Sequence, residues 1–472
     1  MQSAGLAAVV LLLLLLLRQR ALHGEDTRLF VLWLGSGDLG ALPRHFGFLP
    51  LVSGLGRLLR PLGCCWFDVL LVASALGSAF GVFALHRAGR WLCPPMAAWW
   101  LPVALLAVPT WFFFATAAEI HGVFLLPLGV AWWALARWSA RPSLVWALLA
   151  GLGSGASATV HFTGHFLSLS LAVTAACLRV VPWRVLLMHS VTLGIGHAAA
   201  VAGVALLLGL SPFVQFSAAS SFAGSWSAIF HVSELPTVVW EELLLPFLPW
   251  SVLALLAFRV ASARSWAMAA LATLLLHAPI TLSILSSPGH EWEHGAYLLT
   301  YAVPAILATM RSLPPPGFVA AVVASVVLAL WMQAPRLRRV YDPEFAAGVL
   351  ELRQERQFTL LVGSHSGDVE ALTIGVEGQL FVDSDKLKAW VDFEATKPDG
   401  MSLAQWFDEQ VGFFERLQHP LLICASARAM FDLYQNAAIR ALWRGHIETS
   451  YILEVVDRRG LHAWFLRRRE PR

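Results

Sequence analysis

The side chains most able to do chemistry in this sequence are a few acids and bases set among long apolar runs. Asp38 stands in the loop GSGDLG (35–40), whose glycines would let a ligand approach the backbone closely. Arg44 and His45 follow, and then a short amphipathic segment that carries Arg57. An acid, basic residues and a surface-lying helix beside a membrane suit a lipid-phosphate substrate. An ordinary polar loop between two spans has the same pattern, so that alternative stays open.

Glu119 is the second candidate, because it lies between two apolar runs within residues 110–138. An ionisable group inside a membrane is costly unless it lines a cavity or pairs, which favours a functional role. A residue at the interface, solvated by lipid headgroups, is the alternative. His121 lies two residues further on, and helix neighbours at that spacing do not face each other. We therefore expect His121 to point away from Glu119.

Histidines and acids elsewhere could bind a metal or a substrate. His161 and His165 are four residues apart, so on one helix face they could bind a metal or, when protonated, a phosphate. They lack the central Glu of the metalloprotease motif, and hydrogen-bonded histidines of a helix bundle have the same spacing. Glu291, Glu293 and His294 share one loop, which would suit a divalent ion, a sugar hydroxyl or simple solvation. The sequence thus assigns no definite cofactor, and a divalent metal ion is the candidate cofactor.

These residues must be positioned by membrane-spanning helices. The chain has 472 residues, of which 58% are hydrophobic and only 13% charged, against roughly 25% charged in soluble domains. Apolar runs near the length that a bilayer requires recur through the chain and predict an α-helical polytopic membrane bundle of about eleven transmembrane helices. The runs are 1–17, 66–86, 97–114, 119–138, 144–160, 161–179, 185–209, 238–258, 266–285, 296–311 and 317–334.

Arginine and acid alternate between the breaks that separate these runs. The breaks that carry arginine and no acid, a mark of the cytoplasmic side, are 86–95, 136–143, 177–184, 258–265 and 310–317. All ten carboxylates before residue 335 fall at or near the opposite face in this arrangement. Asp38, Glu119, His161, His165 and the loop 286–297 are therefore expected on one non-cytoplasmic surface.

The composition changes near residue 335, which predicts two domains, 1–334 and 335–472. Residues 335–472 hold 20 of the 30 acids and all three lysines, and their pattern is that of a soluble α/β domain. About eleven spans from a cytoplasmic N-terminus would place this domain outside the cytoplasm. We expect strands at 358–363, 372–376, 380–383 and 421–426, helices at 402–417 (opened by a capping box) and 427–443, and a terminal hairpin around Arg459-Gly460.

The first 180 residues resemble the GT-C superfamily of integral-membrane glycosyltransferases, in particular its protein O-mannosyltransferase-like branch. The matching motifs, in order, are Gly37-Asp38, HFGFLPL (45–51), VSGLGRLL (52–59), AAEIHGV (117–123) and the pair His161 and Thr163. This sequence lacks the two prolines that follow the family's histidine and the acid expected just after Gly-Asp. It also has Phe48 and His121 where the family has tyrosine.

The resemblance implies sugar transfer from a polyprenyl-phosphate donor to a protein, lipid or glycan at the non-cytoplasmic face. Asp38 would be the general base, and Glu119 would position its partner or the acceptor. Arg44, His45 or Arg57 would hold the donor phosphate. The implied location is a bacterial inner membrane or its equivalent, with membrane lipid as a partner.

Two other classes of protein remain open at this stage. In a transporter or lipid-carrier flippase the same acids would form a proton relay. An inactive GT-C scaffold would keep the bundle and use its outer domain to bind partners. A transporter is expected to show inverted repeats and broken helices at mid-membrane, and the sequence shows no internal repeat.

Overall fold

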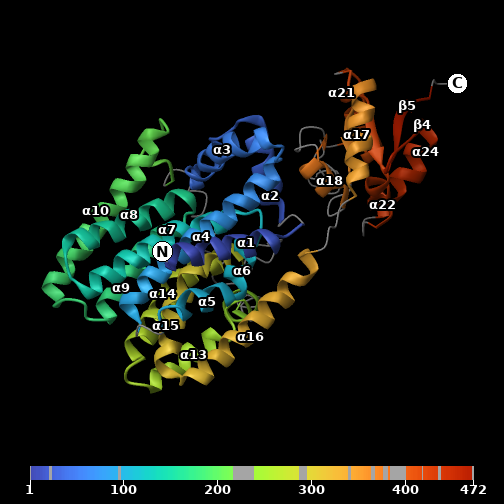
Figure 1. The fold of residues 1–472 in the computed structure, drawn as a ribbon. Helices are drawn as coiled ribbons and strands as arrows, with labels where there is room; N and C mark the ends of the chain where they lie inside the picture. Colours follow the sequence, from blue (N-terminus) through green and yellow to red (C-terminus); the bar gives the residue numbers. More distant parts are fainter. Residues whose placement is uncertain are drawn as a thin grey trace. The chain divides into compact units, whose positions relative to one another are not determined.

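A computed structural model describes residues 2–20, 24–93, 97–215, 239–285, 295–337, 342–362, 367–375, 381–382, 400–416, 418–433 and 437–469 (Figure 1). The chain divides into two compact units. One comprises Met1–Thr27, Asp38–Cys64 and Asp68–Arg338, and the other comprises Arg28–Gly37, Cys65–Phe67 and Arg339–Arg472.

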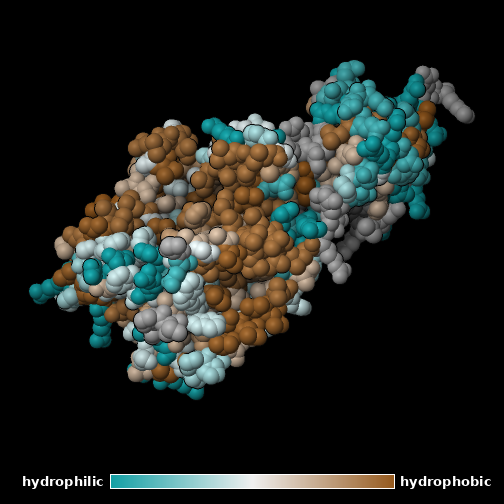
Figure 2. All heavy atoms as spheres, in the orientation of Figure 1, coloured by the Kyte–Doolittle hydropathy of each residue, from teal (hydrophilic) through white to brown (hydrophobic). Residues whose placement is uncertain are grey.

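The first unit is helical and has an apolar exterior. Among the described residues, four helices are long and apolar enough to cross a membrane: α4 (Trp66–Leu92), α7 (Ile120–Ala140), α10 (Trp183–Leu207) and α16 (Pro315–Gln333). A pair bent by 84°, Val239–Phe247 and Trp250–Arg259, would make a fifth if it is a single span. Figure 2 shows the apolar surface that such helices present. The protein is therefore an integral membrane protein, whereas the number of eleven spans stays a prediction.

Other helices complete this unit, most of them close to the predicted runs. They are α1 (Gln2–Leu16), α3 (Phe48–Leu59), α5 (Trp100–Ala107), α6 (Pro109–Thr116), α8 (Leu144–Val160), α9 (Gly164–Cys177), α13 (Trp250–Leu256), α14 (Arg264–Leu285) and α15 (Ala302–Ser312). Helix α2 (Gly24–Ser36) has residues in both units. The predicted run 97–114 is two helices because Pro109 begins a new one and the residue before a proline avoids the helical conformation. The amphipathic segment that carries Arg57 is α3, which buries Val52 and exposes Leu58.

Glycines let the helices around the site approach closely. A Cβ on Gly77 or Gly81 of α4 would collide with the backbone of α7. A Cβ on Gly151 or Gly155 of α8 would likewise collide with the backbone of α10. Small residues permit such close backbone contact between membrane helices. These two contacts fix α7 and α10 beside the helices that carry the remaining site residues.

The arginine-bearing segments between the apolar runs lie in contact with one another. The Arg137 guanidinium lies 4.4 Å from the ring centre of Trp91. Arg311 donates a hydrogen bond to the Leu92 carbonyl at 2.7 Å, and Ser262 donates to the Arg311 carbonyl at 3.3 Å. These residues belong to four of the five breaks that hold arginine and no acid, so the arginines gather at one side of the helical unit.

The second unit contains a five-stranded mixed sheet of order β2-β1-β3-β5-β4. Strands β1, β2 and β3 are parallel, and β5 pairs antiparallel with both β3 and β4. The strands are β1 (Thr359–Leu361), β2 (Phe381–Val382), β3 (Leu421–Cys424), β4 (Tyr451–Arg458) and β5 (Leu461–Arg468). The helices are α17 (Pro343–Glu355), α18 (Gly367–Gly375), α21 (Leu403–Arg416), α22 (Ala425–Leu433), α23 (Ala437–Leu442) and α24 (Glu448–Ser450).

Most local patterns in this unit are confirmed. The region predicted as one helix, 427–443, contains two helices, α22 and α23, and residues 434–436 lie outside the described residues. The Ser402 N–H donates to Gln405 at 2.8 Å and the Gln405 N–H donates to Ser402 at 3.2 Å, so the capping box forms. The predicted hairpin is β4 and β5, and its two turn residues have positive φ. The predicted strand at 372–376 is wrong, because residues up to Gly375 belong to α18. Acids in the first turn of that helix favour its formation.

Candidate functional site

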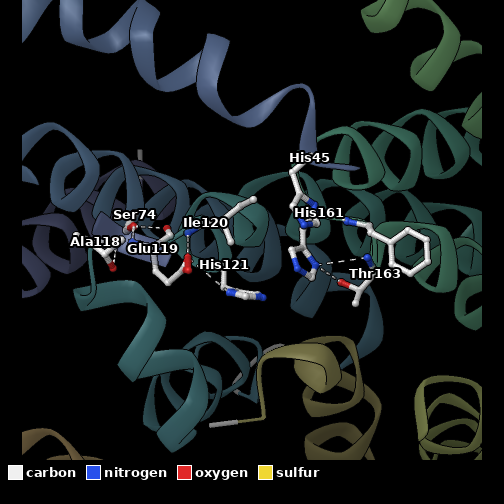
Figure 3. Close-up of polar contacts among 10 residues, drawn as sticks. His45, Ser74, Ala118, Glu119, Ile120, His121, His161 and Thr163 are labelled. Carbon is white, nitrogen blue, oxygen red and sulfur yellow. Dashed lines mark hydrogen bonds and ion pairs between the residues drawn. The ribbon is translucent and has the colours of Figure 1, made fainter. Parts of the chain in front are cut away.

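Glu119 is held at a break between two helices. It is the N-cap of α7, with an extended backbone, and its carboxylate accepts a hydrogen bond from the Ile120 N–H (Figure 3). Ser74 donates to the Glu119 carbonyl at 2.8 Å, and Thr27 donates to the Ala118 carbonyl at 3.0 Å. Only 2% of Glu119 is exposed. Its position is therefore set by its own helix start and by two segments that are distant in the sequence.

His121 turns toward Glu119, so the expectation that it points away is wrong. Its Nδ1 lies 3.8 Å from Glu119 Oε2. The spacing rule applies to two residues inside a helix, whereas Glu119 precedes the helix in an extended conformation. Because of this break, the side chains of Glu119 and His121 lie on the same side although the residues are two positions apart.

The rings of three histidines pack against one another beside this carboxylate. His45 stacks on His161 with centroids 4.6 Å apart and planes only 6° apart, and His121 packs on His161 at 4.3 Å. The Thr163 hydroxyl lies 2.8 Å from His161 Nδ1. The Tyr297 ring adds a wall 5.8 Å from His161. The structure thus brings four predicted residues, His45, Glu119, His161 and Thr163, into one cluster.

The hydrogen bonds of His45 define which ring nitrogen carries the proton. The Phe162 N–H donates to His45 Nδ1 at 3.2 Å, so Nδ1 is an acceptor and the proton of a neutral ring is on Nε2. Burial, reinforced by the charge of neighbouring Arg44, lowers the pKa of His45 to about 3. This imidazole is therefore a neutral N–H donor at physiological pH.

His165 belongs to a different network from His161. The helix breaks between them, since α8 ends at Val160 and α9 begins at Gly164, so they do not share the helix face that a joint metal or phosphate site would use. Both are hydrogen-bonded, as the alternative of bundle histidines predicts. His165 Nδ1 lies 2.8 Å from His197 Nε2, and its Nε2 lies 2.9 Å from the Gln215 side-chain oxygen. Sequence reasoning missed His197 and Gln215. Their signal is polarity, because His197 lies within apolar α10.

Gln215 connects this second network to the first. Its amide donates to the Arg44 carbonyl at 2.7 Å and to the Ala158 carbonyl at 2.6 Å. Arg44 directly precedes His45. The loop that presents His45 is therefore anchored from α8 and from the segment after α10.

The remaining predicted residues are more exposed or fall outside the described residues. Asp38 and Arg57 are exposed and Arg44 is partly exposed. Asp38 and Glu119 therefore do not form a buried acid pair. The acidic loop with Glu291, Glu293 and His294 lies outside the described residues. Within the described ranges, no three side chains of His, Cys, Asp or Glu are arranged to hold a metal ion.

The chain has the fold of the GT-C glycosyltransferases, which confirms at the level of fold the resemblance in its motifs. Two solved structures are of ArnT from Cupriavidus metallidurans. The one bound to undecaprenyl phosphate matches with a TM-score of 0.56 and 17% identity over 98% of this chain and 97% of ArnT. The apo structure matches with a TM-score of 0.57 at the same identity and coverage. No family model matches the sequence, and no curated protein matches it.

Proposed function

We propose that this protein is a membrane glycosyltransferase that moves a sugar from a polyprenyl-phosphate donor to a protein, lipid or glycan acceptor. The observation that carries the proposal is Glu119, buried at a helix break beside three packed histidines, in a chain with the GT-C fold. A buried ionisable group in a membrane bundle is costly, and its retention favours a role in function. The ArnT structure bound to undecaprenyl phosphate supports this class of donor carrier.

Asp38 and Glu119 are the proposed catalytic residues. The acceptor hydroxyl attacks the anomeric carbon, the bond from that carbon to the phosphate oxygen breaks, and Asp38 takes the hydroxyl proton. Asp38 is exposed and follows Gly37, whose φ is +77°, so an acceptor can approach the carboxylate. Glu119 positions the acceptor.

The donor phosphate is proposed to bind at the loop before α3. Phosphate oxygens accept hydrogen bonds, and His45 Nε2–H is a neutral donor for them. Arg44 and Arg57 supply positive charge for the leaving polyprenyl phosphate. His161 and Thr163 support the ring of His45 and complete this part of the site. His165, Glu291, Glu293 and His294 remain proposed substrate-binding residues.

An apolar groove is proposed to hold the prenyl chain. It lies between α1, α5, α6 and α16, has a volume of about 380 Å³, and is lined by residues such as Leu6, Leu106, Phe112 and Leu330. Its wall α6 continues directly into the break at Glu119. A chain in this groove would therefore have its phosphate end led toward the site.

The proposed sidedness rests on the charge pattern. We propose that the site and a separate α/β domain, residues 335–472, are extracytoplasmic. The gathering of the arginine-bearing breaks supports one cytoplasmic side for them.

Purified variants test this function. Asp38→Asn keeps the shape and removes the proton acceptor, so sugar transfer from undecaprenyl-phosphate hexoses and pentoses should fall at least about 10²-fold. Binding of undecaprenyl phosphate should persist. Glu119→Gln should raise the KM for the acceptor. Asp68→Asn, in the first turn of α4, is the control and should keep full activity.

Each outcome bears on a different part of the proposal. Near-normal turnover in Asp38→Asn would end the role of Asp38 as base. Failure of the unaltered protein to bind undecaprenyl phosphate would contradict the donor class.

A further inference from the structure

We infer that His121 and Glu119 form a hydroxyl-binding subsite, in which His121 Nε2 accepts a hydrogen bond from a sugar or acceptor hydroxyl. The inference rests on the proposed function. It assigns a role to His121, which stands where the GT-C family has a tyrosine.

His121 is buried without hydrogen-bond partners. It is 4% exposed, and neither ring nitrogen makes a hydrogen bond with any described residue. Most buried polar side-chain atoms in proteins have a partner, because an unsatisfied one costs free energy. A ligand that supplies the missing hydrogen bond would explain why this imidazole stands among apolar rings.

Glu119 determines which nitrogen of His121 carries the proton. Its Oε2 accepts the Ile120 N–H and therefore acts as an acceptor, and this same atom lies 3.8 Å from His121 Nδ1 (Figure 3). That distance is too long for a hydrogen bond, but an acceptor oxygen still attracts an N–H more than it attracts a lone pair. The proton of neutral His121 is thus on Nδ1, and Nε2 has a free lone pair.

The two histidines at either end of the packed rings then select different ligand groups. His45 has its acceptor nitrogen occupied by the Phe162 N–H and offers an N–H, which suits a phosphate oxygen. His121 offers an acceptor, which suits a hydroxyl and not an ionised phosphate. His161 lies between them, at 4.6 Å from one and 4.3 Å from the other.

The rings around His121 suit a sugar or a similar polyol. Phe114 lies 4.6 Å away, His161 4.3 Å and Tyr297 6.2 Å, measured between ring centroids. Such walls offer apolar contact to the C–H groups of a ligand and leave Nε2 as the hydrogen-bonding atom. The hydroxyl can come from the transferred sugar or from the acceptor, and the two sources are separable by binding.

The test compares His121→Phe, which keeps a flat ring, with His121→Gln, which keeps an acceptor oxygen. His189→Phe is the matched control, because His189 is equally buried, has an unpartnered Nδ1 and stacks on Trp138 at 5.5 Å. The probes are undecaprenyl phosphate alone and the same lipid carrying a hexose or pentose. Loss of one neutral hydrogen bond should weaken binding about 5- to 10-fold.

If the hydroxyl belongs to the transferred sugar, His121→Phe should weaken binding of the sugar-linked lipid and leave binding of undecaprenyl phosphate unchanged. For an acceptor hydroxyl, both lipids should bind normally and the acceptor KM should rise by that factor. In either case His121→Gln should recover part of the loss and His189→Phe should change nothing. Unchanged binding and KM in His121→Phe would overturn the inference.

A substrate-free measurement separates this inference from the proposed function. In protein with ¹⁵N-labelled histidine, the signal that disappears in His121→Phe should be that of an Nδ1–H tautomer, and Glu119→Gln should alter it. An Nε2–H tautomer would overturn the inference even if the glycosyltransferase proposal holds. Failure of the unaltered protein to bind undecaprenyl phosphate would contradict the proposed function. The tautomer of His121 would still show whether its Nδ1–H faces Glu119 Oε2.

Discussion

At the scale of single residues, function here depends on what each polar atom faces. His161 and His165 are four residues apart, yet one packs with His45 and His121 while the other contacts His197 and Gln215. The imidazole of His45 is a donor because a backbone N–H occupies its Nδ1. Residue type therefore indicates which chemistry is available, and the neighbours decide which chemistry is used.

Cys424 provides a residue-scale prediction in the second unit. It ends β3, is fully buried, and its Sγ lies 3.0 Å from the Ser426 hydroxyl. Burial raises the pKa of this thiol to about 12. The thiolate is the reactive form, so Cys424 should resist alkylation in the folded protein at pH 8, whereas the partly exposed Cys64 should react.

The sign of the pH dependence follows from the raised pKa. The folded protein favours the protonated thiol of Cys424. The stability that this preference contributes is complete at neutral pH and is lost as the pH rises from the ordinary thiol pKa of 9.0 toward about 12. Mass spectrometry of alkylated peptides, with and without denaturant, measures the alkylation of Cys424 and Cys64. Alkylation of folded Cys424 at the rate of Cys64 would contradict the burial of its thiol.

At the scale of elements, breaks between helices create the site. Glu119 lies at the break between α6 and α7, and His161 lies at the break between α8 and α9. Backbone groups at such breaks lack helical partners, which is why the hydroxyls of Ser74 and Thr27 bind there. Glycine contacts between the helices then hold the breaks in place.

Two glycines of α10 test this role of close packing. A Cβ on Gly196 would collide with the Leu148 carbonyl of α8, whereas a Cβ on Gly194 would meet nothing within 4 Å. Gly196→Ala should destabilise the protein by about 1–3 kcal/mol, because overpacking forces the helices apart. Gly194→Ala should be neutral or stabilise by up to about 1 kcal/mol, since alanine favours the helix. Thermal unfolding in detergent compares them, and equal shifts would argue against the α8–α10 contact.

At the scale of the whole molecule, two kinds of surface require two environments. The exposed side chains of α10 and α16, such as Leu187, Ile195 and Val327, are apolar as lipid-facing residues are. The second unit has its own hydrophobic core, with Leu360, Phe407 and Ile423 fully buried. The helical unit thus presents side chains suited to lipid, and the second unit encloses a core of its own.

The proposed sidedness predicts the outcome of reporter fusions. Alkaline phosphatase fused after Arg472 should be active, because the enzyme folds only outside the cytoplasm, and a green fluorescent protein fused there should be dark. The same reporters inserted at the break after Arg141 should give the opposite result, since this break belongs to the arginine-bearing side. Cytoplasmic reporter activity after Arg472 would rule out an extracytoplasmic C-terminal domain.

Features that depend on neighbouring residues could be predicted from the sequence. Hydropathy located the helices, turn and cap residues defined the capping box at Ser402 and the hairpin, and the motifs indicated the GT-C fold. These signals are local, because burial in lipid, helix capping and turn formation involve residues close in the chain.

The arrangement of the site could not be predicted, because it joins residues that are far apart in the chain. His45 and His161 meet across 116 positions, and Thr27 contacts Ala118 across 91. The structure also turned His121 toward Glu119, left Asp38 exposed and placed residues 372–375 in a helix. The contacts of His45, His121 and Thr27 depend on distant segments or on where a helix breaks, and periodicity within one segment carries no information about them.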